Sequence, residues 1–305
     1  MPAAITLSAP SVEESDTRIA DDSRLVYGTG LTSSLRMGDT VEPTSLIKLA
    51  TWNIGGGILG ASHQRGGIPS PDYYASVLRQ HAPDVVCLQE AHDYLGRRES
   101  QPHYLARRAG YPHVVSFPTS ASHLAGDANL TLAVLSRFPL GNAVYRQFPN
   151  PGLTGTGPDG EAWSLADKGY MITKVDLGGR QVGLINGHCF PLRYFGARAT
   201  DPGFAGVWDM LTRDMLTLKE SGPAVVAVDL NHDPIEDVLN EVLRRDRYIN
   251  AFANTATAVK GAKRDFVLYE QGMRLLSATV TATESDHAYR QVSLLVECST
   301  SQIHR

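Results

Sequence analysis

Residues 225–233 read Val-Val-Ala-Val-Asp-Leu-Asn-His-Asp, an apolar run that ends in polar side chains. The run follows a Gly-Pro pair, is rich in valine and is too short for a helix, which is typical of a buried strand. Successive side chains on a strand point to opposite faces, so Asp229 and Asn231 are expected on one side, about 7 Å apart at Cα. A buried strand that ends in a carboxylate and a carboxamide predicts a site there, because strand ends aim their side chains rigidly.

The same stretch has a second interpretation, in which its polar end is only a turn. Pro234 precedes helical spacing at Val238 and Leu239, which predicts a helix with Pro234 at its first position. We expect Asp233 to cap that helix. Whether Asp229 and Asn231 are functional then depends on how the other strands end.

Other strand-like segments also stop at polar residues. Asn53, Glu90 and His188 each lie at or near the end of an apolar run, and Asp286-His287 lies between two such runs. Five segments of this kind predict one shared site at the strand ends. The four further segments are residues 47–54, 84–90 and 182–188, and the pair 278–282 and 291–296.

Seven short motifs occur in an order and spacing that resemble the endonuclease/exonuclease/phosphatase superfamily. This superfamily includes deoxyribonuclease I, exonuclease III type nucleases, neutral sphingomyelinases and inositol polyphosphate 5-phosphatases. The resemblance extends from about Leu46 to Cys298 and implies an α/β fold, a four-layer α-β-β-α sandwich of two packed mixed sheets flanked by helices. The motifs are Trp52-Asn53-Ile54, Gln89-Glu90, Leu135-Ser136-Arg137-Phe138-Pro139, His188, Asp229-Leu230-Asn231, Asp265 and Ser285-Asp286-His287.

Length and composition agree with one domain of this size. The chain has 305 residues, of which 42% are hydrophobic and 20% charged, so it can bury a large core. Residues 1–45 show little periodicity and are expected to form a tail or arm, and residues 46–300 the catalytic domain. A net charge of −4 argues against a surface built around nucleic-acid phosphates, although it is compatible with a local basic groove.

Cysteine usage and the N-terminus bear on the compartment. Cys87, Cys189 and Cys298 are odd in number and widely spaced, so no disulfide framework is implied. The first residues lack a basic region and a long apolar stretch, and no run reaches membrane-spanning length. We therefore expect a soluble, cytoplasmic protein with no membrane contact; the sequence leaves its oligomeric state open.

The remaining periodicity predicts further elements. Helices are expected after Ser70, where Pro71 begins an amphipathic run that ends at Ala82-Pro83, and over residues 203–220. Residues 92–110 are helical in pattern but contain Pro102, which predicts two short helices. Strands are expected at residues 113–117, 130–135, 171–175 and 181–185, the last two as a hairpin, with a long loop at 150–160.

Phosphoester hydrolysis requires a catalyst that neutralises charge, positions water and stabilises the leaving oxygen. A hard divalent cation suits the first task, and Mg²⁺ prefers carboxylate and water oxygens at about 2.1 Å. Glu90 is the predicted ligand, with Asp286 second and Asn53 beside them through its amide oxygen; the resemblance implies the same assignment. Mg²⁺ or Mn²⁺ is the expected cofactor.

Catalytic roles follow for the other strand-end residues. Asp229 would orient or deprotonate the attacking water, and Asn231 would donate to the phosphate. His287 would give the phosphate a charge-assisted hydrogen bond, with Asp265 holding its imidazole, as the resemblance implies. His188 resembles the histidine that deoxyribonuclease I and the sphingomyelinases use on the phosphate or leaving group; without the resemblance, a structural role would be the simpler interpretation.

Four residues are candidates for the substrate edge of the site. His92 lies two residues after Glu90, where deoxyribonuclease I has an arginine that reaches its substrate. Asn129 falls near the place where some relatives carry a tyrosine on the phosphate. Arg193 and Arg198 follow His188 closely and could hold a phosphate backbone.

Three functions remain open at this point. A small phosphorylated metabolite, or another small diester or pyrophosphate, is the first hypothesis, since the sequence has no dense Lys/Arg cluster, no apolar membrane-facing hairpin and no secretion signal. A nuclease acting on DNA or RNA is the second. The third is a fold reused for a non-hydrolytic reaction or a binding role, because fold alone does not define a substrate.

Overall fold

The strand that ends at Asp229 lies inside a six-stranded mixed sheet in the computed structural model. The model describes residues 45–59, 67–96, 98–157, 160–244, 247–253 and 264–296. The strand order of this sheet is β11-β12-β10-β9-β8-β5; β10 runs parallel to β9 and antiparallel to β12. Its strands are β5 (Val144–Gln147), β8 (Gly169–Asp176), β9 (Gln181–His188), β10 (Ala224–Asp229), β11 (Tyr248–Asn250) and β12 (Asp265–Glu270).

A second six-stranded sheet packs against the first. Its strand order is β13-β14-β1-β2-β4-β3, with β1 parallel to β2 and antiparallel to β14. Both large sheets are therefore mixed. Its strands are β1 (Ser45–Asn53), β2 (Val85–Tyr94), β3 (His113–Ala121), β4 (Ala128–Ser136), β13 (Met273–Thr281) and β14 (Tyr289–Val296); a separate ribbon pairs β6 (Thr154–Thr156) with β7 (Ala162–Ser164).

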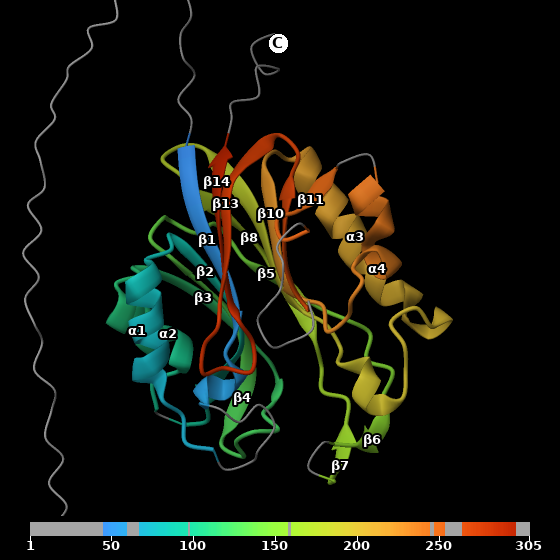
Figure 1. Ribbon diagram of the computed structural model, residues 1–305. Coiled ribbons are helices and arrows are strands. Elements are labelled where there is room, and N and C mark those ends of the chain that lie inside the picture. Colours follow the sequence, from blue (N-terminus) through green and yellow to red (C-terminus); the bar gives the residue numbers. More distant parts are fainter. Residues whose placement is uncertain are drawn as a thin grey trace, which may run out of the picture. The chain divides into compact units, whose positions relative to one another are not determined.

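Helices cover the outer face of each sheet, as Figure 1 shows. Helices α1 (Pro71–His81) and α2 (Gln101–Ala109) lie on the sheet that contains β1, and α3 (Ala205–Glu220) and α4 (Glu236–Leu243) lie on the sheet that contains β10. Short 3₁₀ turns are η1 (Gly55–Gly57), η2 (Leu192–Phe195) and η3 (Pro202–Phe204).

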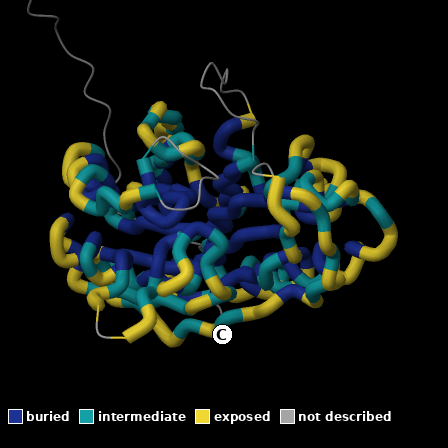
Figure 2. The backbone as a smooth tube through the Cα atoms, turned by 90° about the horizontal axis from the view of Figure 1, so that it is seen from below, coloured by how far each residue is buried: buried dark blue, intermediate teal, exposed yellow. Residues whose placement is uncertain are grey.

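Three apolar cores separate these layers. One lies between α1, α2 and the sheet that contains β1, one lies between the two sheets, and one lies between the sheet that contains β10 and α3, α4. The buried stretches run as parallel bands between exposed connections in Figure 2. The predicted four-layer α-β-β-α sandwich is confirmed.

Local sequence explains the central elements. All six residues of β10 are buried, as expected of an apolar strand with a layer on each face. In α3, Val207, Leu211 and Met215 recur every four residues and form the buried stripe. Gly183 in β9 lets that helix approach, because a Cβ there would stand 2.6 Å from the Leu218 side chain.

Three local predictions were wrong. Helix α4 begins at Glu236 with Ile235 at its N-cap, so Asp233 does not cap it and Pro234 precedes it. Strand β2 continues to Tyr94, and a single helix follows, with Pro102 in its first turn where the missing N–H costs nothing. The loop predicted at 150–160 contains β6.

Some predictions fall outside the described residues. Residues 1–44, which make up nearly all of the predicted tail, lie there, as does Cys298, so the domain boundary at residues 45/46 stays a prediction. Cys87 and Cys189 are buried and unpaired. Among the described helices, none combines the length and apolar character that crossing a membrane requires.

Candidate active site

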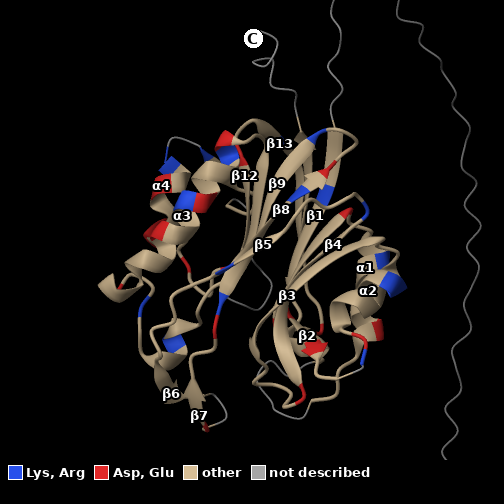
Figure 3. Cartoon of the chain, turned by 180° about the vertical axis from the view of Figure 1, so that it is seen from behind, with Lys and Arg blue, Asp and Glu red and all other residues tan. Residues whose placement is uncertain are grey.

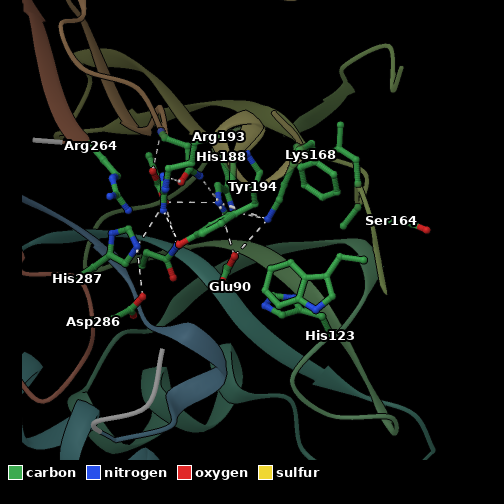
Figure 4. A pocket seen from close by; sticks show the side chains of 18 of the residues that line it. Glu90, His123, Ser164, Lys168, His188, Arg193, Tyr194, Arg264, Asp286 and His287 are labelled. Atoms are coloured by element: carbon green, nitrogen blue, oxygen red, sulfur yellow. Dashed lines mark hydrogen bonds and ion pairs between the residues drawn. The ribbon is translucent and has the colours of Figure 1, made fainter. Parts of the chain in front are cut away.

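Side chains from both large sheets meet at one cavity of about 210 Å³ (Figure 4). Strands β1, β9 and β10 each end at or beside it, Glu90 reaches it from within β2, and the connection from β13 to β14 closes another side. Strand β12 begins behind it. The predicted site residues that line it are Asn53, Glu90, His188, Arg193, Asp229, Asn231, Asp286 and His287.

Asp229 is completely buried at the centre of this cluster. Its Oδ2 accepts a hydrogen bond from Asn53 Nδ2 at 3.0 Å, and its Oδ1 accepts one from the Asn231 amide N–H at 3.0 Å. Burial raises the pKa of Asp229 to about 6, against the opposing effect of the nearby His287 charge. A carboxylate with this pKa can take a proton from water near neutral pH.

His287 carries the complementary charge. Its Nδ1 donates to the Asp265 carboxylate at 3.0 Å, and its Nε2 lies 3.9 Å from Asp229 Oδ2. Burial alone would lower the pKa of His287, but the Asp265 and Asp229 carboxylates raise it well above the ordinary value. The imidazolium can therefore donate from Nε2 into the cavity. Asp265 itself lies behind His287 and does not line the cavity.

Glu90 enters the cavity from an irregular point in β2. The pairing of β2 with β4 shifts register between Leu88 and Ala91, and Glu90 has a φ of +53°. A β-bulge of this kind re-aims a side chain. Burial works against ionisation of Glu90, yet the charge of Lys168 holds its pKa well below the ordinary value.

Lys168 is a central residue that the sequence patterns did not indicate. Its side chain is buried, and its Nζ lies 3.2 Å from Glu90 Oε1 and 3.1 Å from His188 Nδ1 (Figure 4). It precedes β8, whose first residue Gly169 pairs with His188 at the end of β9. The predicted hairpin of residues 171–175 and 181–185 implies this register. This hairpin pattern was therefore the sequence signal that could have placed Lys168 near His188.

His188 lies between the two carboxylates. Its Nε2 is 3.4 Å from Asp229 Oδ2 and 3.6 Å from Glu90 Oε1. Burial, with the neighbouring Lys168 charge, lowers the pKa of His188 well below the ordinary value, so the ring is neutral. Asn231 Nδ2 lies 3.2 Å from the same nitrogen and donates to the Cys189 carbonyl at 3.1 Å.

The oxygen donors facing the cavity fit a hard divalent cation. Glu90 and Asp286 both line it. Burial raises the pKa of Asp286, and the Glu90 charge adds to this effect while His287 opposes it. Two mutually repelling carboxylates are a favourable donor pair for Mg²⁺ or Mn²⁺. The amide of Asn53 is already engaged, because Nδ2 donates to Asp229 and Oδ1 accepts from Gly55 N, which leaves one oxygen lone pair for a ligand role.

A second group of acidic and histidine donors has a different chemistry. Asp229, Asp265 and His287 place one donor atom each within 4.8 Å of one another. The raised pKa of His287 keeps its ring protonated, and its Nδ1 is committed to Asp265. A protonated imidazole is no metal ligand. Within this group Asp265 and His287 form a hydrogen-bonded pair, and Asp229 faces the imidazole Nε2 at 3.9 Å.

Three predicted edge residues lie away from the cavity. His92 is completely buried; its Nε2 pairs with Ser122 Oγ at 2.9 Å, and burial lowers its pKa to about 4. Asn129 lies within β4, opposite Asp93, and Arg198 is exposed beyond η2. None of the three is among the described lining residues, whereas Arg193 is.

Several lining residues lie outside the predicted strand ends, on β7, on η2 and in loops. Their positions depend on long-range packing that sequence periodicity does not report. Arg193 joins them through its Nη1, which donates to Asn231 Oδ1 at 3.3 Å. The residues are His123, Trp163, Tyr194, Phe195 and Arg264.

Two mixed sheets that carry acidic, amide and histidine side chains to one cavity define the fold class of metal-dependent phosphoesterases and nucleases. The chain belongs to the Endonuclease/Exonuclease/phosphatase family, whose model matches residues 50–287. Members of this family are hydrolases that act on phosphoester bonds.

Individual relatives agree with this assignment. Sphingomyelin phosphodiesterase 5 from Danio rerio is 38% identical over 112 residues, which is 34% of this chain and 19% of that protein, so the match spans about a fifth of the relative. The endonuclease/exonuclease/phosphatase structure from Beutenbergia cavernae has a TM-score of 0.59 at 20% identity, covering 82% of this chain and 72% of that one. TDP2 from Caenorhabditis elegans has a TM-score of 0.54 at 14% identity, covering 83% and 75%. At these identities the two structures show a shared fold.

Proposed function

We propose that this chain uses Mg²⁺ or Mn²⁺ to hydrolyse a phosphoester of a small phosphorylated substrate, by in-line attack of an activated water. The observation that carries the proposal is geometric: a carboxylate held by Asn53 and an imidazole held by Asp265 face each other in one cavity. Asp229 is a base with a pKa of about 6, and His287 is an acid whose Nε2 lies 3.9 Å away. Water attack on a phosphoester requires both kinds of group.

The base would act from a fixed position. Asn53 and the Asn231 amide each hold one oxygen of Asp229, so the carboxylate cannot rotate freely. His287 would donate to a phosphate oxygen from Nε2, and Asp265 holds its tautomer through Nδ1. Fixed groups of this kind lose little entropy when the substrate binds.

Positive charge for the phosphate would come from three basic side chains that line the cavity. Lys168 is buried beside Glu90 and His188, and Arg193 and Arg264 also line the cavity. These cations can offset the negative charge on the equatorial oxygens of the phosphate. This electrostatic effect is stronger in a site that excludes water. Glu90 and Asp286 would hold the divalent cation, which supplies further charge neutralisation of the phosphate when bound.

The size of the cavity favours a small substrate. Its volume of about 210 Å³ lies below the roughly 300–1,000 Å³ that is common for pockets of drug-sized ligands. Lys/Arg and Asp/Glu positions are interspersed over α3 and α4 in Figure 3, as over a solvated helix face. This mixed charge pattern offers little basic surface for a nucleic-acid backbone to bind. It supports the metabolite hypothesis over the nuclease hypothesis.

A phosphodiester of the sphingomyelin type is the second candidate. The observation that favours it is the similarity to sphingomyelin phosphodiesterase 5 at 38% identity over 112 residues. The two candidates differ in the bond cleaved, because a diesterase releases a phosphorylated head group and a monoesterase releases inorganic phosphate.

A substrate panel tests the proposal. Phosphomonoesters, small diesters, pyrophosphates, sphingomyelin in detergent and plasmid DNA would be incubated with Mg²⁺, with Mn²⁺ and with chelator, and the products quantified. We expect metal-dependent turnover of a small phosphoester that Glu90→Gln abolishes. Cleavage of DNA at far lower enzyme concentration than any small substrate would overturn the choice of substrate class. Metal-independent turnover would overturn the proposed chemistry.

A further inference from the structure

A row of aromatic side chains forms one side of the cavity. The Trp163 ring lies 5.5 Å from the His123 ring and 5.9 Å from the Tyr194 ring, at interplanar angles of 55° and 69°. All three residues line the cavity, and Trp163 is half-buried. Tilted and edge-to-face rings at these distances attract one another. The row is thus a packed wall rather than a set of separate surface rings.

Trp163 is held by the separate ribbon of β6 and β7. Gly157, which follows β6, lies against the indole so closely that a Cβ there would collide with the ring. Gly155 packs on η2, where a Cβ would stand 2.8 Å from the Tyr194 carbonyl oxygen. Because both glycines permit close approach, the ribbon fixes the position of the indole.

The same segment connects the aromatic row to the catalytic centre. Leu165 N donates to Leu153 O at 2.8 Å, and Asn150 Nδ2 donates to Leu165 O at 2.9 Å and to Asp167 Oδ1 at 2.8 Å. The next residue is Lys168, beside Glu90. Most of the run from residue 162 to residue 168 therefore lines the cavity, with an aromatic ring at one end and an ammonium group at the other.

We propose that Trp163 is a specificity-determining residue that contacts the organic substituent of the phosphoester. This inference rests on the proposed function, since it places the phosphate between Lys168 and His287. The substituent then lies against the aromatic row, which favours a planar or apolar group. This contact leaves the interactions of the phosphate unchanged, because neither Asp229 nor His287 belongs to the aromatic row.

Binding of two phosphonates tests the inference without requiring turnover. Phenylphosphonate and methylphosphonate share the charged group and differ in the substituent, and neither contains a hydrolysable ester. Their dissociation constants would be measured by calorimetry in the presence of Mg²⁺ for the wild type, Trp163→Ala, Trp163→Leu and Trp163→Phe. Tyr104→Ala, which removes a ring of α2 outside the cavity, is the control.

The wild type should bind phenylphosphonate roughly three- to tenfold more tightly than methylphosphonate, the factor expected for one aromatic contact. Trp163→Ala and Trp163→Leu should bring this ratio near one and change methylphosphonate binding less than twofold. Trp163→Phe should keep most of the preference for phenylphosphonate, and Tyr104→Ala should keep all of it. A wild-type ratio near one, or an equal loss for both ligands in Trp163→Leu, would overturn the inference. Turnover of phenyl phosphate by the wild type, measured separately, tests the proposed function alone.

Discussion

At the scale of single residues, the catalytic proposal depends on Asp229 and His287, whose Oδ2 and Nε2 atoms lie 3.9 Å apart. Burial raises the pKa of the carboxylic acid to about 6, while the Asp265 and Asp229 carboxylates raise that of the imidazole. Between these two pKa values the pair contains one base and one acid, which is the state that hydrolysis needs.

The pH dependence of kcat/KM follows from this pair. Below pH 6 Asp229 becomes protonated and cannot accept a proton from water, so activity should rise with pH through about 6. Asp229→Asn should lower kcat about 10²–10⁴-fold. A pH profile of both proteins checks this prediction; an acid limb near pH 4, the ordinary range of a carboxyl group, would contradict it.

Removing the ammonium group of Lys168 should weaken phosphate binding. Lys168→Met should raise KM about 10–100-fold, since hydrogen bonds to charged groups contribute about 1.5–3 kcal/mol, and Lys168→Arg should recover part of the loss. Lys174→Met, on the exposed side of β8, the strand that follows Lys168, is the matched control and should leave KM unchanged. Steady-state kinetics of both variants check this prediction. Equal increases in KM at both lysines would show that the role of Lys168 is only structural.

The sequence predicted that Asn53, His188 and Asp229 end their strands, but not that β2 continues past Glu90. Glu90 and His92 would share one face under simple alternation. The bulge at Glu90 breaks that alternation and sends His92 inward, where it packs under Gly56. A bulge of this kind depends on the neighbouring strand, so a single-strand pattern could not reveal it.

At the scale of elements, a buried polar bridge joins the two sheets beneath the site. Asn186 in β9 donates to the carbonyls of Leu88 at 3.1 Å and Ala133 at 2.9 Å, and accepts from Gln89 Nε2 at 2.7 Å. The bridge links the strand that carries His188 to the strand that carries Glu90. It therefore holds the two halves of the site in register.

Replacing Asn186 by leucine should break this bridge. The change keeps the volume but leaves Leu88 O, Ala133 O and Gln89 Nε2 without this partner, and an unmade buried hydrogen bond costs about 1–3 kcal/mol. We expect the free energy of unfolding to fall by about 2–4 kcal/mol and kcat to fall with it. Urea denaturation would measure the change in the free energy of unfolding. Gln181→Leu, at the exposed start of β9, is the control, and equal stability of the two variants would contradict the bridging role.

Strands and helices were predictable because each has a periodic apolar face. Residues 171–188 and 203–220 have strong periodicity and match β8, β9 and α3 closely. The start of α4 and the end of β2 were missed, because proline and polar residues suit several local structures and packing selects one. The ribbon of β6 and β7 lies in a glycine-rich stretch that gave no strand pattern.

At the scale of the whole molecule, the two sheets bring side chains from separate strands to one cavity, where we propose that a divalent cation binds. A cation that binds only the folded chain stabilises it by about 2.7 kcal/mol at 100 times its Kd. For a domain of this size, this should raise Tm by about 5–10 °C. Thermal melts with Mn²⁺ and with chelator should show this shift in the wild type and lose it in Glu90→Gln; an equal shift in both would place the cation elsewhere.

The most direct test of this account is the initial rate of hydrolysis of a small phosphoester by one enzyme preparation, measured with Mn²⁺, after addition of chelator, and after Mn²⁺ is restored. We expect turnover that disappears with the chelator and returns with the metal, and that is lowered at least about a hundredfold in Asp229→Asn. Turnover that survives the chelator, or that Asp229→Asn retains in full, would contradict it.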